Sequence, residues 1–204
     1  MRKWTAMLLV AAALMAWCAV ASADEVTDAM AKAEQAYAAK EYKDASAELQ
    51  TALVGVNKVL IGLIEAELPD PPSGWTAEDP EGTDATALGA GFFGSVMVSR
   101  GYTTPDGTTV DVTIAANSPM IGALQAYITN PMLAAMTGEE MKKTEICGND
   151  AIEEFNADGD EASINILAGR ATLISVEGDS YSDEAHVRTL AGVIDCAAIV
   201  ELVE

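Results

Sequence analysis

Residues 94–115 read GSVMVSRGYTTPDGTTVDVTIA, two runs rich in β-branched residues on either side of Pro105-Asp106-Gly107. Apolar and polar side chains alternate in the second run, as they do along a strand with one buried face. A short hairpin loop needs a residue in the left-handed conformation, and Gly107 is suited to that place. The stretch therefore predicts a β-hairpin and indicates that the surrounding domain is built on an antiparallel sheet.

Four more segments with strand character follow this hairpin, at residues 142–147, 151–156, 162–168 and 170–177. Helices are expected at 119–129, which begins with proline after a serine cap, and at 182–194, which begins with Ser182-Asp183-Glu184. Strands joined mainly by tight turns, with helices grouped apart from them, are typical of an α+β domain with an antiparallel sheet and flanking helices.

The segment before this domain has a different composition. Residues 24–67 contain no proline and are rich in Ala, Glu, Lys and Leu, and Lys40-Glu41 separates two helical stretches. Five apolar residues follow one another at steps of four and three residues: Leu49, Leu53, Val56, Leu60 and Leu63. This is the spacing of one apolar face of a helix. The segment therefore predicts an antiparallel helical hairpin.

The chain begins with the three parts of a secretory signal. Arg2 and Lys3 are basic, an apolar run extends from Met7 to Val20, and Ala21-Ser22-Ala23 provides the small residues of a cleavage site. The apolar run is shorter than the roughly 20 residues that span a bilayer, so no membrane span is expected in the mature chain. We expect cleavage after Ala23 and a periplasmic or secreted protein.

Four segments result from these features. Residues 1–23 are the signal peptide, 24–67 the helical hairpin, 68–85 a linker rich in Pro and Gly, and 86–204 the α+β domain. The linker begins with Pro69-Asp70-Pro71-Pro72, which breaks the helix before it.

The chain is strongly acidic, with a formal net charge of −21. Removing Arg2 and Lys3 with the signal leaves nine basic against 32 acidic side chains, a net charge of −23 for the mature protein. Such a surface repels phosphate groups, which argues against binding to nucleic acid or to an anionic membrane surface. Cationic partners and simple solubility both remain open.

The hairpin carries a resemblance to a known repeat. Its small and large apolar residues, Ala33, Tyr37, Tyr42, Ala45, Leu49 and Ala52, are spaced as in a tetratricopeptide-type helical hairpin. The match covers one repeat, and a single repeat cannot bury its apolar face alone. The resemblance implies that the hairpin packs on the rest of the chain, on a second protomer or on another protein.

Short motifs spread over the mature chain resemble a family of uncharacterised secreted proteobacterial proteins. They are Leu68-Pro69, Gly74-Trp75, Asn117-Ser118-Pro119-Met120, Asn130-Pro131-Met132 and Val176-Glu177-Gly178. The second half is also similar to the PsbP-like fold, an antiparallel sheet flanked by helices. These resemblances carry no catalytic residue and imply a non-enzymatic binding or assembly accessory that acts on another protein of unknown identity.

Two cysteines remain after the signal, Cys147 and Cys196, in an oxidising compartment. A disulfide between them closes a loop of about 50 residues and stabilises the fold by up to about 4 kcal/mol. The alternative is a pair of buried thiols, and the sequence leaves both open.

A metal site is the alternative to a purely protein-binding role. Oxygen ligands at alternate positions, as in a calcium loop, occur at Asn156, Asp158, Asp160 and Glu161. The order of an EF-hand is absent, because Gly159 lies between the aspartates, so a hairpin turn at Asp158-Gly159 is the preferred interpretation. Four methionines, Met120, Met132, Met136 and Met141, are the corresponding candidates for copper. No cofactor is expected.

No enzyme motif stands out from the sequence, and no catalytic residue is predicted. The single histidine, His186, falls among charged residues of a predicted helix and is interpreted as facing solvent. The apolar, glycine-rich stretch around Phe92 and Phe93 is the first candidate for a segment that binds a partner protein.

Overall fold

A computed structural model gives the structure of residues 25–84, 94–118, 120–129, 141–155, 162–178 and 184–204. The chain divides into two compact units, Met1–Val59 and Leu60–Glu204, and the division falls inside helix α2 (Tyr42–Glu67). The described residues of the first unit are helical, and the second unit is built on a sheet.

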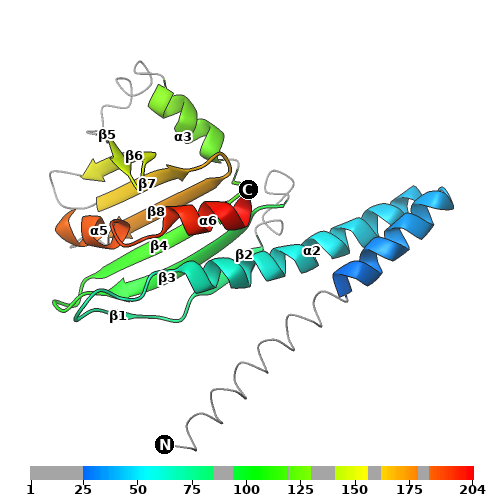
Figure 1. The fold of residues 1–204 in the computed structure, drawn as a ribbon, viewed down its shortest axis with the longest axis horizontal. Coiled ribbons are helices and arrows are strands. Elements are labelled where there is room, and N and C mark those ends of the chain that lie inside the picture. Colours follow the sequence, from blue (N-terminus) through cyan, green and yellow to red (C-terminus); the bar gives the residue numbers. More distant parts are fainter. Residues whose placement is uncertain (1–24, 85–93, 119, 130–140, 156–161, 179–183) are drawn as a thin grey trace, which may run out of the picture. The chain divides into compact units, whose positions relative to one another are not determined.

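The first unit is a hairpin of two helices (Figure 1). A helix over residues 25–38 is followed by a tight turn in which Lys40 has a φ of 65°, and α2 begins after it. The helices contact each other through small residues, since Ala29, Ala33, Ala45 and Ala52 are buried. Gly55 lies so close to Val26 that a Cβ at this position would collide with it. The predicted helical hairpin is confirmed.

The second unit is built on one antiparallel sheet of eight strands. The strands are β1 (Thr76–Ala77), β2 (Glu81–Asp84), β3 (Val96–Thr103), β4 (Thr109–Ala116), β5 (Met141–Ile146), β6 (Asn149–Phe155), β7 (Ala162–Ala168) and β8 (Thr172–Gly178). They lie in the order β1-β3-β4-β8-β7-β6-β5, and β2 also pairs with β3. The helices are α3 (Met120–Thr129), α5 (Glu184–Ala191) and α6 (Cys196–Val203). The predicted α+β class with an antiparallel sheet is confirmed.

The turn between β3 and β4 is held by side chains as well as by the backbone. Gly107 has a φ of 91°, in the left-handed region that the sequence predicts for it. Asp106 Oδ1 accepts hydrogen bonds from Thr108 N at 3.3 Å, from Thr108 Oγ1 at 3.0 Å and from Thr104 Oγ1. These bonds, first from Thr104 and then from Thr108, lower the pKa of Asp106.

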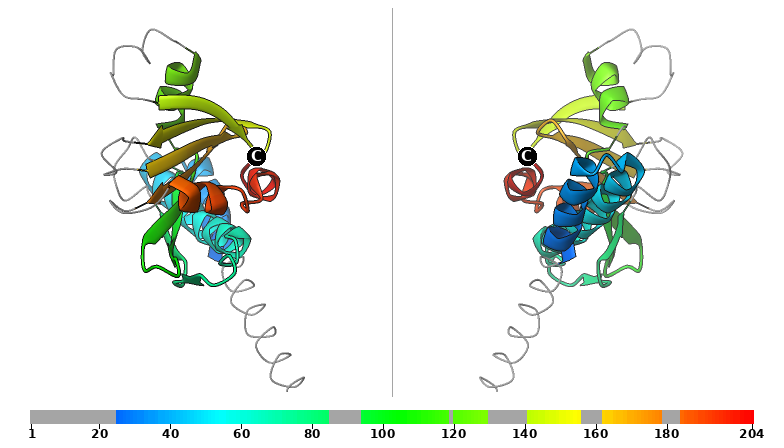
Figure 2. Two further views of the ribbon diagram at one scale, coloured as in Figure 1. Left: turned by 90° about the vertical axis from the view of Figure 1, so that its left-hand side faces the viewer. Right: turned by 90° about the vertical axis from the view of Figure 1, so that its right-hand side faces the viewer.

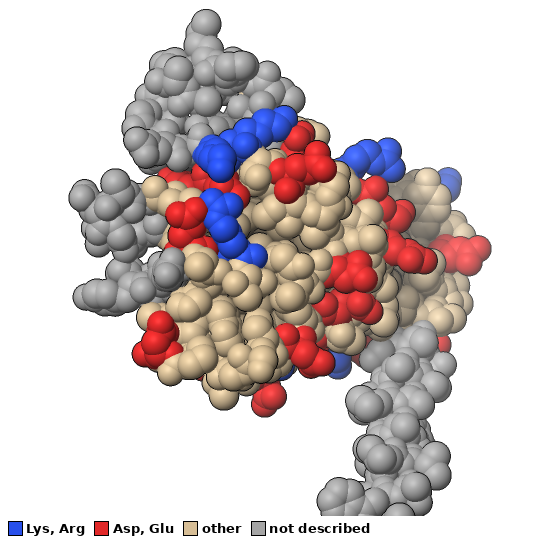
Figure 3. Space-filling view, turned by 60° about the vertical axis from the view of Figure 1, so that its left-hand side comes forward, with Lys and Arg blue, Asp and Glu red and all other residues tan. Residues whose placement is uncertain are grey.

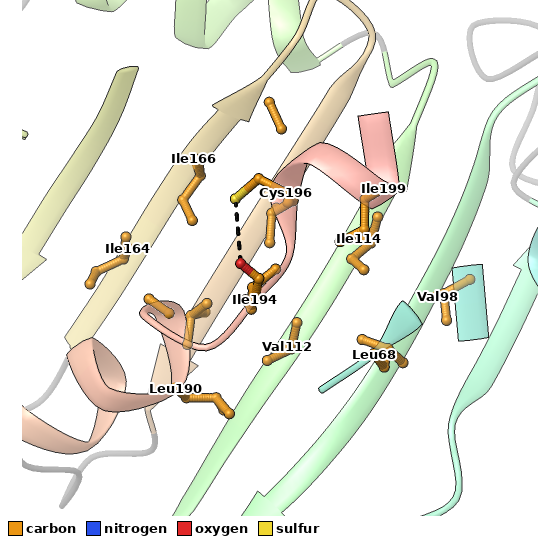
Figure 4. Packing of buried hydrophobic residues seen from close by; sticks show 14 of the residues in the cluster. Leu68, Val98, Val112, Ile114, Ile164, Ile166, Leu190, Ile194, Cys196 and Ile199 are labelled. Atoms are coloured by element: carbon orange, nitrogen blue, oxygen red, sulfur yellow. Dashed lines mark hydrogen bonds between the residues drawn. The ribbon is translucent and has the colours of Figure 1, made fainter. Parts of the chain in front are cut away.

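One face of the sheet carries the main core, and α5 and α6 cover it (Figures 1 and 2). Every second residue of the central strands points into this core, for example Val98, Val112, Ile114, Ile164, Ile166 and Ile174. They pack against Leu190, Ile194 and Ile199 from the C-terminal helices and against Leu68 after α2 (Figure 4). Because each fully buried aliphatic side chain contributes about 1.5–3 kcal/mol, this layer stabilises the unit.

The opposite face of the sheet is only partly apolar. At one end Ile121 of α3 packs on Ala115, Leu167 and Leu173 in a second, smaller cluster. Polar residues occupy the neighbouring positions on this face, where Ser175 Oγ lies 2.9 Å from Asn165 Oδ1 and 2.8 Å from Glu177 Oε1. The sheet therefore has one core face and one face that is open to polar contacts.

Three elements of the second unit were not predicted. The short strands β1 and β2 lie within residues 68–85, where the sequence indicates a linker, and both pair with β3. The expected helix over 182–194 is shorter, as α5 ends at Ala191, and a separate helix α6 follows. Asp195 begins this last helix by accepting a hydrogen bond from Ala198 N at 3.0 Å.

Candidate functional site

The helical hairpin exposes its large apolar side chains. The exposed fractions are 57% for Met30, 68% for Tyr37, 59% for Tyr42, 57% for Leu49 and 49% for Val56. Small alanines fill the contact between the two helices, so these large residues take no part in it. We call these five residues the hairpin face.

Helical periodicity places the five residues on one side of the hairpin. Met30 and Tyr37 are seven residues apart on the first helix, and Tyr42, Leu49 and Val56 are seven apart on α2. Seven residues make nearly two full turns of an α-helix, so each set forms one stripe. The rings of Tyr37 and Tyr42 pack edge to face, with their centroids 5.6 Å apart, and so join the two stripes at the turn.

Val54 provides a reference on the same helix. It is 53% exposed, much like Leu49, but lies five residues further along α2. Five residues turn an α-helix by about 140°, so Val54 lies on a different side from the hairpin face. It is therefore a matched control for any test of that face.

The apolar residues of α2 also give this helix the character of a membrane span. By length and composition it is long and apolar enough to cross a bilayer. An 18-residue stretch of it has a mean hydropathy of 1.4, and 17% of this stretch is buried. One such helix is weak support for a membrane protein. Ile64, near the end of the helix, is fully buried in the sheet unit, which indicates a helix that belongs to a folded domain.

The second unit carries an acidic cleft of about 380 Å³ beside β3, β4 and β8. Five carboxylates line it, those of Glu78, Asp79, Glu81, Asp111 and Glu177. A Cβ at Gly101 would lie 3.1 Å from Asp111 Oδ1 and 3.4 Å from Glu78 Oε2, so these two carboxylates approach each other over the glycine. Figure 3 shows acidic side chains in several groups on the face that it draws.

Among the described residues, Arg100 is the one basic residue that lines this cleft, and its side chain donates hydrogen bonds to the backbone. Its Nε donates to Glu78 O at 2.8 Å and its Nη1 donates to Pro69 O at 3.2 Å. The hydroxyl of Tyr102 donates to the same Pro69 oxygen at 2.8 Å, and burial raises the pKa of this hydroxyl. Within the described ranges, no group of three or more His, Cys, Asp or Glu residues could hold a metal ion.

His186 differs from its predicted position in solvent. Its ring is partly buried and packs edge to face on Trp75, with the ring centroids 5.5 Å apart. Nδ1 is buried and has no hydrogen-bond partner among the described residues. The prediction of a solvent-facing histidine is therefore wrong, because α5 turns this residue toward Trp75.

An ion-pair cluster lies on the core side of the sheet. Glu153 on β6 is only 2% exposed and accepts hydrogen bonds from both terminal nitrogens of Arg188, the one from Nη2 to Oε2 at 2.8 Å. Lys142 Nζ lies 3.6 Å from the same carboxylate, and Glu184 also binds Arg188. The hydrogen bonds that Arg188 donates to Glu153 and then to Glu184 raise the pKa of its guanidinium. The cluster fixes α5 on β6, which is a structural role.

The structure brings Cys147 and Cys196 together in a disulfide with their Cα atoms 6.2 Å apart, a normal separation. Cys147 lies in the turn between β5 and β6, and Cys196 is the buried first residue of α6. The carbonyl oxygen of Ile194 lies 4.0 Å from Cys196 Sγ (Figure 4). The disulfide attaches the outer strands of the sheet to the C-terminal helix.

The other predicted site residues lie outside the described residues. These are Phe92 and Phe93 and the candidate calcium ligands Asn156, Asp158, Asp160 and Glu161. The same holds for Met132 and Met136 of the copper alternative, while Met120 and Met141 begin α3 and β5. Neither the hairpin face nor the acidic cleft was predicted as a site, although the spacing of seven residues was a signal for the first.

These features define an α+β protein with a helical hairpin whose large apolar side chains remain exposed. No family model, no curated protein and no solved structure matches the chain. The resemblances to a tetratricopeptide-type repeat, to a secreted proteobacterial family and to the PsbP-like fold stay predictions.

Proposed function

We propose that the protein is an exported, non-enzymatic accessory that binds another protein molecule through its hairpin face. The observation that carries the proposal is the exposure of five large apolar side chains, between 49% and 68%, on one side of a two-helix element. Contiguous apolar patches of this kind are typical of sites that bind a partner.

Burial of the hairpin face provides the energy for binding. Covering exposed apolar surface contributes roughly 25 cal/mol per Å², and aromatic side chains such as Tyr37 and Tyr42 contribute the most area. The small residues of the hairpin are already buried between its own two helices. A partner therefore binds a preformed surface of large side chains, and ordering that surface on binding costs little conformational entropy.

The charges around the hairpin favour a protein partner over a lipid surface. Amphipathic helices that bind anionic membranes have basic residues beside their apolar stripe. Lys43 and Lys58 of α2 each lie more than a quarter turn from the stripe of Leu49, by the same helical periodicity. The chain as a whole is acidic, which adds repulsion from anionic lipid.

Several observations support the non-enzymatic and exported parts of the proposal. His186, the only histidine, packs on Trp75, which fits a structural role. The resemblance to a single tetratricopeptide-type repeat implies a neighbour that covers the hairpin. The signal sequence over residues 1–23 supports transport out of the cytoplasm.

Photo-crosslinking from single positions tests the proposal in cells that export the protein. A benzophenone side chain is placed at Leu49, in the hairpin face, or at Val54, which is equally exposed on another side of α2. We expect an adduct from position 49 and at least tenfold less from position 54. No adduct from position 49, or equal yields from both positions, contradicts the proposed function.

A further inference from the structure

We infer that the partner seated on the hairpin face is a second copy of this chain, packed as a two-fold symmetric dimer. This inference rests on the proposed function, because it names the partner of the same face. It is carried by the spacing of the apolar residues and by the distribution of charge, and the area of the surface indicates its affinity.

The spacing along α2 is that of helices that pack on helices of another chain. Tyr42, Leu49 and Val56 recur every seven residues along α2. Leu53 lies four residues after Leu49 and three before Val56, which gives alternate steps of four and three. This is the a and d pattern of a coiled coil, whose knobs fit the holes of a helix with the same repeat. A surface of this kind is complementary to its own copy, as a two-fold interface requires.

The charge distribution permits two copies to meet at the hairpin. Residues 25–59 contain six acidic and four basic side chains, a net charge of −2. Residues 60–204 contain 25 acidic and five basic side chains, a net charge of −20. Two sheet units therefore repel each other strongly, whereas two hairpins are nearly neutral toward each other. A second copy can use the hairpin face and is kept away from the rest of the surface.

The dimensions of the hairpin indicate a weak dimer. The series from Tyr42 to Val56 extends over about 21 Å at 1.5 Å per residue. Two helices side by side are about 18 Å wide, so the face measures about 380 Å² in each copy and about 760 Å² in a dimer. This is below the roughly 1,000 Å² of a stable interface, so we expect a transient dimer of low affinity.

Sedimentation equilibrium of the purified mature chain tests the inference. Between about 5 and 200 μM we expect a transition from the mass of one chain to the mass of two. Leu49→Glu places a charge in the face and raises the dissociation constant at least tenfold. Val54→Glu adds the same charge on another side of α2 and leaves the dissociation constant within twofold. Far-ultraviolet circular dichroism verifies that both variants fold, and Val56→Glu replaces Leu49→Glu if that variant does not.

Salt gives a second readout. Because the two chains carry charge of the same sign, screening reduces their repulsion, and the dimer tightens when NaCl is raised from 50 to 500 mM. A contact based on opposite charges weakens over the same range. A dissociation constant that rises with salt contradicts an apolar interface between two copies.

The outcomes separate this inference from the proposed function. A monomer at every concentration, with a crosslinked adduct at position 49 to a different protein, overturns the second copy and keeps the protein-binding role. A monomer without any adduct overturns both. A dimer that Val54→Glu disrupts as strongly as Leu49→Glu overturns the hairpin face as the interface.

Discussion

The two units use apolar residues in opposite ways. The sheet unit buries its large aliphatic side chains, with Ile114, Ile164, Ile174 and Leu190 all at 0% exposure. The hairpin buries alanines and exposes its tyrosines, methionine and leucine. Because burial of large side chains dominates folding energy, the sheet unit is stabilised from within, whereas the exposed side chains of the hairpin contribute little to its folding.

Truncating one leucine in each unit tests this comparison most directly. Leu190→Ala removes a fully buried side chain of α5 and is expected to lower the free energy of unfolding by about 3–5 kcal/mol. Leu49→Ala removes an exposed side chain and is expected to change it by less than about 0.5 kcal/mol in the monomer. Urea unfolding at about 1 μM protein measures both. Similar losses from the two variants would show that the hairpin has an internal core.

The disulfide adds a second difference between the units, since both cysteines lie in the sheet unit. It joins residues 49 positions apart, and a loop of this length stabilises the folded chain by up to about 4 kcal/mol in the entropic model. We expect the double variant Cys147→Ala/Cys196→Ala to lose up to this amount in urea unfolding. Reduction of the wild-type protein with dithiothreitol should produce a similar loss and leave the double variant unchanged. Equal stability with and without reductant contradicts the prediction.

The buried ion pair tests whether an ion pair in the sheet unit contributes more to stability when it is buried than when it is exposed. Arg188→Ala leaves the 2% exposed carboxylate of Glu153 with only the exposed Lys142 beside it. Breaking such a pair is expected to cost about 3 kcal/mol. The control is Arg170→Ala, whose side chain is 90% exposed and lies 3.6 Å from Glu204; its loss is expected to stay below about 1 kcal/mol. Thermal unfolding that ranks the two variants equally refutes the structural role of the Glu153 cluster.

Most of the sheet could be predicted because its strands alternate in polarity or are continuously apolar. Strands β3 to β8 lie within a few residues of their predicted ranges. The edge strands β1 and β2 were missed because Glu81-Gly82-Thr83-Asp84 has no apolar side to bury; it is held by backbone pairing with β3. Helix α6 was missed although Asp195 provides a cap before an apolar run.

The candidate sites depended on contacts that spacing alone does not give. The pair of Glu153 and Arg188 joins residues 35 positions apart and requires the register of β6 against the position of α5. The acidic cleft collects carboxylates from the β1–β2 segment, from β4 and from β8. The apolar period of α2 was visible in the sequence, but only the structure shows that alanines face the other helix and leave Leu49 exposed.

The smallest expected effect concerns the β3–β4 turn, where an exposed carboxylate acts locally. Asp106 has a lowered pKa because Thr104 and Thr108 donate hydrogen bonds to its ionised form. A group whose pKa is lower in the folded state adds stability above its unfolded pKa, near 3.9, and this stability is lost as the pH falls through the folded value. We therefore expect Asp106→Asn to lower the melting temperature slightly between pH 5 and 7, and the difference from wild type to disappear as the pH falls well below about 4.

The comparison with wild type isolates Asp106 from other carboxylates. Glu204 also has a lowered pKa, because the backbone N–H groups of Arg170 and Ala171 donate to its side chain, so both proteins lose stability in acid. Only the difference between their melting curves belongs to Asp106. If this difference persists at pH 2, the amide changes stability through its shape or packing and not through the loss of charge. The charge of Asp106 then does not stabilise the turn, and Gly107 and the backbone alone hold it.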